Sequence, residues 1–265
     1  MASVLYDPEK VLILGIAGHA RSGKDTAARF ISEFFKNVYN EKFIDKEDIG
    51  VLLSGGLNLE IFRFADPIKN AAAEFMKYFF DMKESGGLHM PANRYFDMNE
   101  ILKQLDEYKN NGELIHGIDI RKTQQQLGSV MRNQNKDIFV EIMIERIKKA
   151  LPDPDYGKTD IGDFVADFGL YGKHIVIIPD TRFANEESLM RETFGDCYKL
   201  ILVDRPEITE KAARREPPYD HESEQQISLL NPDVTIQNDK DLDDLKTNTI
   251  NQIMKILVFQ GWVNG

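Results

Sequence analysis

The sequence predicts an α/β fold in which helices flank a parallel sheet. Two short apolar runs, Val11–Ile16 and His174–Ile178, are rich in branched side chains and have the length of strands buried on both faces. Each run ends in a polar turn that leads into a stretch with helical periodicity. The first of these turns, Gly18–Lys24, fits the pattern G-x-x-x-x-G-K. An order of strand, glycine-bearing turn and helix is typical of α/β proteins.

The turn Gly18–Lys24 reads GHARSGK and has the composition of a phosphate-binding loop. Its glycines let the backbone curl so that several N–H groups point at one anion, and the following helix adds the positive end of its dipole. Lys24 would bridge the outer phosphates as a point charge. Because a buried strand precedes the loop and a helix follows it, we interpret it as a nucleoside triphosphate site rather than a structural turn.

The residue after Lys24 is Asp25, where serine or threonine is usual, and Thr26 follows. A carboxylate beside a polyphosphate is repelled unless a cation lies between them. Asp25 is therefore a candidate Mg²⁺ ligand, directly or through water. An acid in the first turn also complements the helix dipole, and the two roles are compatible.

Composition limits the function classes. The 265 residues suffice for one large α/β domain or two small ones. With 33 basic and 44 acidic residues the net charge is −11, which opposes a nucleic-acid-binding surface. The single cysteine, Cys197, excludes an internal disulfide and fits a reducing compartment. No apolar run approaches a membrane span and Met1–Lys10 is unlike a signal peptide, so we expect a cytoplasmic protein with no membrane partner.

Periodicity and turn residues place the remaining elements. We expect further strands at Leu59–Phe64, Lys199–Val203 and Val234–Gln237. We expect helices at Asp25–Asn37, Ile68–Phe80, near Met98–Tyr108, Asp119–Arg132, Asp137–Leu151, Asn185–Phe194, Glu207–Glu216, from His221 onward, and Leu242–Val258.

Polar residues that follow predicted strands are candidates for a ligand site. Asp66 has the position of a helix N-cap with Pro67 in the first turn, which local signals favour. Alternatively, Asp66 and Lys69 contribute to a ligand site at the end of their strand. Asp180 follows the run His174–Ile178, where phosphate-loop proteins place a carboxylate that orients Mg²⁺.

Two polar clusters lie on predicted helices. Arg121, Gln125 and Ser129 share one face, offering a guanidinium for phosphate and an amide for a base edge. Arg214 and Arg215 follow Lys211 at i+3 and i+4, and Arg205 precedes them, so this basic cluster favours a mobile lid that clamps phosphate. A solvated helix face is the alternative for both clusters.

Several segments together resemble the bacteriophage deoxynucleoside monophosphate kinases. They are the loop with its Asp25, FADPIK at Phe64–Lys69, Arg121 with the later Gln-x-Leu-Gly-Ser, and the segment Asp180-Thr-Arg-Phe-Ala-Asn-Glu. Arg205-Pro206, His221-x-Ser-Glu and Asn238 fit the same order, so the resemblance runs from Val11 to about Leu257. It implies a single P-loop kinase domain with a core at 11–64, 174–203 and 232–258. A monophosphate-binding region is implied at about 65–150 and a lid at about 204–224.

The resemblance also implies roles for individual residues. Lys24, Arg182, Arg214 and Arg215 would be catalytic, and Asp25 and Asp180 would hold Mg²⁺. The ATP site would comprise Gly18, Arg21, Ser22, Gly23, Lys24, Asp25, Thr26, the lid residue Arg205, and Asn238 near the adenine. The acceptor site would comprise Asp66, Lys69, Arg121, Gln125, Gly128, Ser129, Arg132, Asp180 and Arg182.

The expected activity is transfer of the γ-phosphoryl group of ATP to a deoxynucleoside monophosphate, in the host cytoplasm if the chain is phage-encoded. One alternative is a P-loop kinase with another acceptor, such as a hydroxymethylated pyrimidine in DNA, which the net charge of −11 opposes. Another is a non-catalytic nucleotide switch. The predicted acceptor and lid arginines oppose it, because a switch needs no second phosphate pocket. Base preference, sugar discrimination and oligomeric state stay open, a homodimer being one option.

Overall fold

The computed structural model describes residues 6–40, 57–73, 119–151, 172–216 and 221–263, together with Lys103, Asp106, Glu107, Lys109, Asn111 and Tyr219. The chain divides into two compact units, one of residues 1–64 and 140–265 and the other of residues 65–139. Each unit is described by itself.

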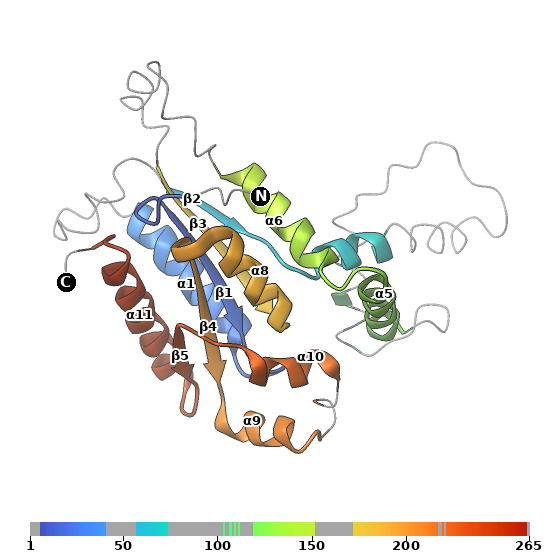
Figure 1. Ribbon diagram of the computed structural model, residues 1–265. Helices are drawn as coiled ribbons and strands as arrows, with labels where there is room; N and C mark the ends of the chain where they lie inside the picture. The colour runs from blue at the N-terminus through green and yellow to red at the C-terminus, as the bar shows by residue number, and fades with distance from the viewer. Residues whose placement is uncertain are drawn as a thin grey trace. The chain divides into compact units, whose positions relative to one another are not determined.

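The first unit is built on a five-stranded sheet with the order β2-β3-β1-β4-β5 (Figure 1). Its strands are β1 (Val11–Ala17), β2 (Leu57–Ile61), β3 (Lys173–Thr181), β4 (Tyr198–Asp204) and β5 (Val234–Gln237). All neighbouring strands pair in parallel. Every residue of the central strand β1 is buried, as a strand covered on both faces requires. The predicted fold class, a parallel sheet flanked by helices, is confirmed.

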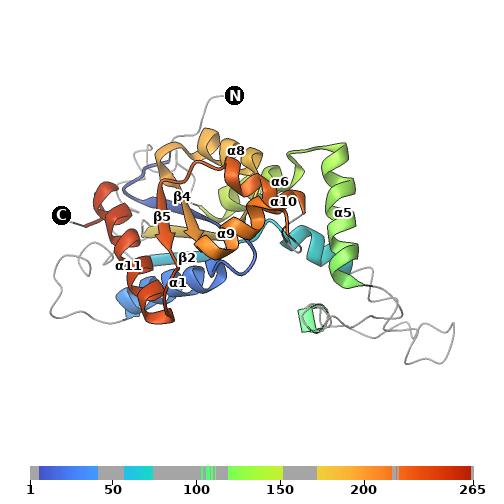
Figure 2. The same cartoon turned by 90° about the horizontal axis from the view of Figure 1, so that it is seen from below.

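Helices cover both faces of this sheet, as Figure 2 shows. On one face α1 (Lys24–Asn40) packs beside α11 (Leu242–Phe259), and α8 (Ala184–Phe194) lies on the other. The core between α1, α11 and the sheet contains Leu14, Ile31, Phe35, Ile177 and Ile253, each no more than 1% exposed.

Short elements complete the first unit. They are α9 (Pro206–Ala213), α10 (Glu222–Gln225) and the 3₁₀ turns Gly195–Cys197 and Gln226–Leu229. The helix α6 (Ile138–Ala150) crosses the boundary between the units, and its Arg146 guanidinium lies 4.7 Å from the centre of the Phe62 ring.

The second strand along the chain differs from its predicted range of Leu59–Phe64, because β2 begins two residues earlier and ends at Ile61. Phe62 still donates its N–H to Ile177 O at 3.0 Å. The Phe64 N–H, however, donates to the Asp180 carboxylate at 3.0 Å and not to a strand carbonyl. The Asp180 side chain, near the end of β3, thus accepts the N–H that a backbone carbonyl would accept if the strand pairing continued.

In the second unit, residues 66–73 are helical and α5 spans Ile120–Gln134. The Asp119 carboxylate caps α5 by accepting from Lys122 N at 3.0 Å. The predicted cap at Asp66 is wrong by one residue: the Ala65 carbonyl accepts the first helical bond, from Lys69 N at 2.9 Å, and Asp66 is the first helical residue. The predicted helix beyond Ala73, and most of the one near Met98–Tyr108, lie outside the described residues.

Within the described residues, no helix is both long enough and apolar enough to cross a membrane.

Candidate functional site

The loop Gly18–Gly23 follows the carboxyl end of β1, and Lys24 begins α1. Its backbone has positive φ at Gly18 (150°), Arg21 (66°) and Gly23 (95°). A Cβ on Gly18 would lie 2.7 Å from Val203 O, and one on Gly23 would lie 2.5 Å from Asn238 Nδ2. The glycines of the predicted pattern are thus required both by φ and by close neighbours, and the loop curls as a phosphate cradle does.

Asn238, at the end of β5, holds one side of the loop. Its Nδ2 donates to Ser22 O at 2.7 Å, and its own N–H donates to Asp204 O at 2.8 Å. A single asparagine therefore ties the loop to the ends of β4 and β5. The resemblance implies a place for Asn238 near the adenine, and the structure adds this contact with the loop backbone.

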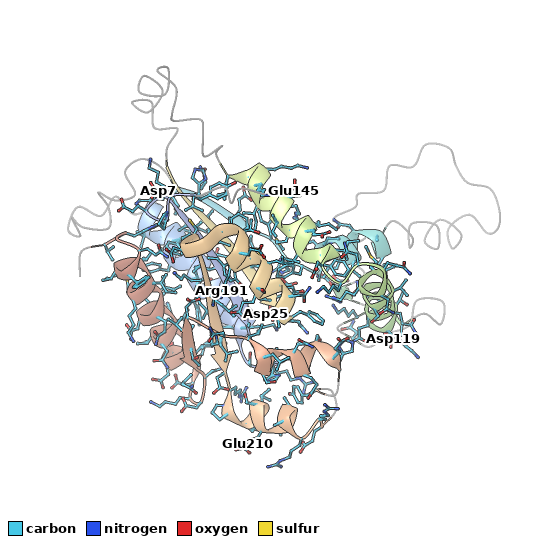
Figure 3. The ribbon with its side chains drawn as sticks, in the orientation of Figure 1. Asp7, Asp25, Asp119, Glu145, Arg191 and Glu210 are labelled. Carbon is cyan, nitrogen blue, oxygen red and sulfur yellow. The ribbon has the colours of Figure 1, made fainter. Side chains whose placement is uncertain are left out.

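Lys24 is only 5% exposed, although its charge must be available to a ligand. Its Nζ lies 3.3 Å from Asp25 Oδ2, and the Asp25 side chain (labelled in Figure 3) is 75% exposed. Water screens the exposed carboxylate of Asp25 and weakens this ion pair, so a phosphate group can replace the carboxylate at little cost. The packing thus fixes the position of the lysine while its charge stays exchangeable.

A pocket of about 390 Å³ adjoins the loop. From the predicted ATP residues the structure brings together Arg21, Gly23, Asp25, Thr26, Arg205 and Asn238, and from the turn before α11 and its first residues it adds Lys240, Asp241, Leu242 and Leu245. The sequence analysis missed these last residues. An available signal was Asp241 ahead of an apolar periodic stretch, which marks a helix N-terminus beside Asn238.

Arg182 lies just after β3 and contacts the short helix α10. Its Nη1 donates to Glu224 Oε1 at 3.1 Å and lies 3.5 Å from Ser223 Oγ. The helix α10 starts with His221 as its cap, whose Nδ1 accepts from Ser223 N at 3.2 Å. The sequence analysis quoted His221-x-Ser-Glu but gave Glu224 no role.

Glu224 is a buried acid, 4% exposed, that also contacts the phosphate loop. Its Oε2 accepts from Ala20 N at 2.9 Å and lies 3.2 Å from His19 Nδ1. Burial by itself would raise the pKa of Glu224, but the hydrogen bonds from His19 and the Ala20 N–H and the charge of Arg182 outweigh it, so its pKa is lowered. Glu224 is therefore an anion within the protein interior.

The residues expected to hold Mg²⁺, Asp25 and Asp180, fit only an ion that keeps other ligands. Asp180 Oδ1 already accepts the Phe64 N–H. No group of three or more His, Cys, Asp or Glu side chains in the described part of the chain could bind a metal by itself. Mg²⁺ usually keeps several waters and takes one or two carboxylates beside substrate phosphates, and the exposed carboxylate of Asp25 suits that arrangement.

The basic segment after β4 differs from its prediction. The helix α9 ends at Ala213, Arg214 is its C-cap, and Arg215 has a φ of 54°. The expected helical face of Lys211, Arg214 and Arg215 is therefore wrong. Pro217 and Pro218 follow in the sequence, and a residue that precedes proline avoids helical backbone.

Two cations of this segment, Lys211 and Arg214, are paired with nearby acids. Lys211 Nζ lies 2.8 Å from Glu207 Oε1. Arg214 contacts Glu210 at 3.6 Å and Glu216 at 3.7 Å, and its side chain is 68% exposed. Arg205 differs from these residues because it lines the pocket.

The predicted acceptor residues of the second unit lie on α5 and on the helix of residues 66–73. Lys69 Nζ lies 3.1 Å from Asp106 Oδ2, and Ser129 Oγ donates to Gln125 O at 3.0 Å within α5. The Arg132 guanidinium lies 4.7 Å from the centre of the Phe139 ring. A Cβ on Gly128 would meet Ile68 Cδ1 at 3.0 Å, so Gly128 allows the two helices to approach. Arg121 lies in the first turn of α5, while Asp180 and Arg182 belong to the first unit.

No family model matches the chain, and no curated protein sequence matches it. Among solved structures, an APS kinase from Mycobacterium tuberculosis, a cysteine-to-alanine mutant, is 12% identical, with a TM-score of 0.31 over 92% of this chain and 98% of that chain. The same enzyme in complex with AMPPNP and APS is 11% identical, with a TM-score of 0.33 over 94% and 98%. A dephospho-CoA kinase from Campylobacter jejuni is 15% identical, with a TM-score of 0.37 over 92% and 96%. These scores are too low to carry an argument, so the fold stands on the strand order and the loop described above.

Proposed function

We propose that this chain is an Mg²⁺-dependent P-loop kinase that transfers the γ-phosphoryl group of ATP to a deoxynucleoside monophosphate. The observation that carries the proposal is the phosphate loop itself. Its glycines adopt positive φ, its lysine is buried in a fixed position, and a pocket of about 390 Å³ adjoins it. That combination suits a nucleotide whose polyphosphate lies in the loop and whose base lies in the pocket.

On the donor side, the loop N–H groups and Lys24 hold the phosphates, and Leu242 and Leu245 give the pocket apolar surface for a base. Asp25, with Asp180, would hold Mg²⁺, which when bound neutralises charge on the phosphate oxygens. Lys24 opposes the charge that develops on the transferred group, and this is the main catalytic contribution available in phosphoryl transfer.

On the acceptor side, Arg182 is the residue that the first unit offers. Glu224 bonds both Arg182 and the loop, which supports a second anion site close to the first. A nucleotide switch has no need of such a site. No general base is required, because a monophosphate oxygen is already an anion.

The finer assignment comes from the sequence resemblance. FADPIK, the Arg121 segment and the Asp180 segment favour a deoxynucleoside monophosphate as acceptor and a bacteriophage source. In this proposal the region at about 65–150 binds the monophosphate and the segment at about 204–224 is the lid.

A coupled assay that detects ADP would test the proposal against all common ribonucleoside and deoxyribonucleoside monophosphates, with ATP and Mg²⁺. We expect ADP formation that depends on a deoxynucleoside monophosphate. ADP formation at the same rate with and without every monophosphate would refute the kinase assignment and favour a slow hydrolase.

A further inference from the structure

Glu224 makes more contacts to the candidate site than any role in the sequence analysis explains. Its Oε2 binds the phosphate loop through Ala20 N and His19 Nδ1, and its Oε1 binds Arg182. Loop and arginine come from the ends of different strands, β1 and β3. One carboxylate thus joins the proposed donor site to the proposed acceptor arginine.

The contacts use both carboxylate oxygens of Glu224, so they require a side chain with two acceptor atoms. A buried carboxylate is costly unless its oxygens are paired, and Glu224 at 4% exposed has charged or N–H partners on each. A glutamine in its place keeps one carbonyl oxygen and presents an NH₂ group instead of the other. With one acceptor oxygen in place of two, glutamine can accept from Ala20 N or from Arg182, and the NH₂ group that faces the other donor cannot replace the lost contact.

The next residue connects the same helix to the lid segment. Gln225 Nε2 donates to Ala212 O at 3.1 Å and to Tyr219 O at 2.9 Å, so α10 is attached to the end of α9. Adjacent residues of α10 therefore face two directions, one toward the loop and Arg182 and the other toward α9.

We propose that Glu224 is a positioning residue that holds the phosphate loop and Arg182 in a fixed mutual arrangement, so that donor and acceptor phosphates meet in line. The proposal rests on the proposed function, because only a two-phosphate reaction needs this alignment. Glu224 itself touches no substrate and acts through Ala20 and Arg182.

The variants Glu224→Gln and Glu224→Ala separate the two contacts. Glu224→Gln can keep the acceptor for Ala20 N and lose the ionic contact to Arg182. Glu224→Ala loses both contacts and leaves the Arg182 charge without its partner. Glu222→Gln on the same helix is the matched control, because the substitution removes the same charge from a side chain that is exposed.

The first measurement is calorimetric binding of ATP with Mg²⁺, with thermal melts to show that each variant is folded. We expect Glu224→Ala to weaken ATP binding about tenfold, Glu224→Gln by less than about threefold, and the control by less than about twofold. ATP affinity of Glu224→Ala equal to that of the wild type would overturn the role at the loop. A wild-type chain that binds no ATP would instead refute the proposed function.

The second measurement is a double-mutant cycle on the monophosphate KM. Arg182→Ala and Glu224→Gln should each raise this KM by about tenfold, and the double variant should be no worse than Arg182→Ala alone. If Glu224 served only the stability of the fold, its substitution would lower the fraction of folded enzyme. The apparent kcat would then fall and KM would stay unchanged. Additive effects of the two changes, or an unchanged KM in Glu224→Gln, would overturn the coupling while leaving the kinase assignment intact.

Discussion

The phosphate loop and the basic segment after β4 both carry cations proposed to act on phosphate, but they hold them in opposite ways. Lys24 is 5% exposed and its backbone is fixed by close contacts on both sides of the loop. Arg214 is exposed and its charge is shared with Glu210 and Glu216. The loop is therefore organised before any ligand binds, whereas the basic segment would have to exchange its partners on closure.

This difference separates two kinds of contribution to a phosphoryl-transfer site. A fixed cation stabilises developing charge without reorganisation, so its removal should be severe. An exposed cation that must leave an acid partner contributes less, because part of its interaction is already present in the free protein. The following changes test that ranking from the largest effect to the smallest.

Lys24→Ala should lower turnover by about a thousandfold, because it removes the fixed charge from the transferred group. The melting temperature should change little, because within the described residues the ionic partner of Lys24 is Asp25, whose side chain is exposed. Steady-state kinetics and a thermal melt measure both effects. Lys36→Ala, an exposed lysine on the same helix, is the control and should retain full turnover. Wild-type turnover in folded Lys24→Ala would contradict the fixed-cation account.

Gly23→Ala should destabilise the protein by about 2 kcal/mol and weaken ATP binding, because its Cβ would displace Asn238 from the loop. Gly261→Ala provides the comparison, since Gly261, just after α11, has a φ of 71° and its added Cβ would meet the end of the Glu9 side chain at an unstrained 4.0 Å. It should cost about 1 kcal/mol from backbone conformation alone. Urea unfolding of both variants gives the two values, and equal losses would mean that the contact with Asn238 is unimportant.

Within the basic segment, Arg205 should behave differently from its neighbours. Arg205→Ala should raise the KM for ATP, because Arg205 lines the pocket in the free protein.

Arg214→Ala and Arg215→Ala should each lower turnover by about tenfold with little change in ATP affinity, if the lid closes in the transition state. Turnover within about twofold of wild type for both would show that these arginines form a solvated surface.

The smallest effect concerns acid stability. The folded chain lowers the pKa of Glu224 below 4.5, so its carboxylate contributes full stability above that pH, and this is lost as the pH falls through the lowered pKa. The groups that face it are His19 and Arg182. Glu224→Gln should flatten the free energy of unfolding between about pH 5 and pH 3. Urea melts across this range, with Glu222→Gln as control, measure the slope; parallel slopes for Glu224→Gln and wild type would contradict the assignment.

The sequence was informative where backbone chemistry decides the structure. The buried runs became β1 and β3, and the glycines of Gly18–Lys24 adopt the positive φ that the pattern predicts. Helix α1 begins at Lys24, directly after the loop. These features depend on neighbouring residues in the chain and on burial, which periodicity reports.

The sequence was less informative where distant residues decide. Nothing local predicts that Glu224 would contact Ala20 and Arg182, because these contacts join residues about two hundred and about forty positions apart. The end of α9 at Ala213 was missed because charge spacing was read as continuing helix, although two prolines follow. The second-unit residues Lys69, Arg121 and Gln125 stay a prediction as an acceptor site.

The fate of the γ-phosphoryl group tests the central claim most directly. ATP labelled at the γ position would be incubated with wild-type protein, Mg²⁺, mixed deoxynucleoside monophosphates and DNA, with Lys24→Ala in parallel. We predict that the label appears in a deoxynucleoside diphosphate with the wild type and that Lys24→Ala forms almost none. Label found in inorganic phosphate alone would indicate a nucleotide switch, and label in the DNA would indicate a polymer kinase; either result would contradict the account.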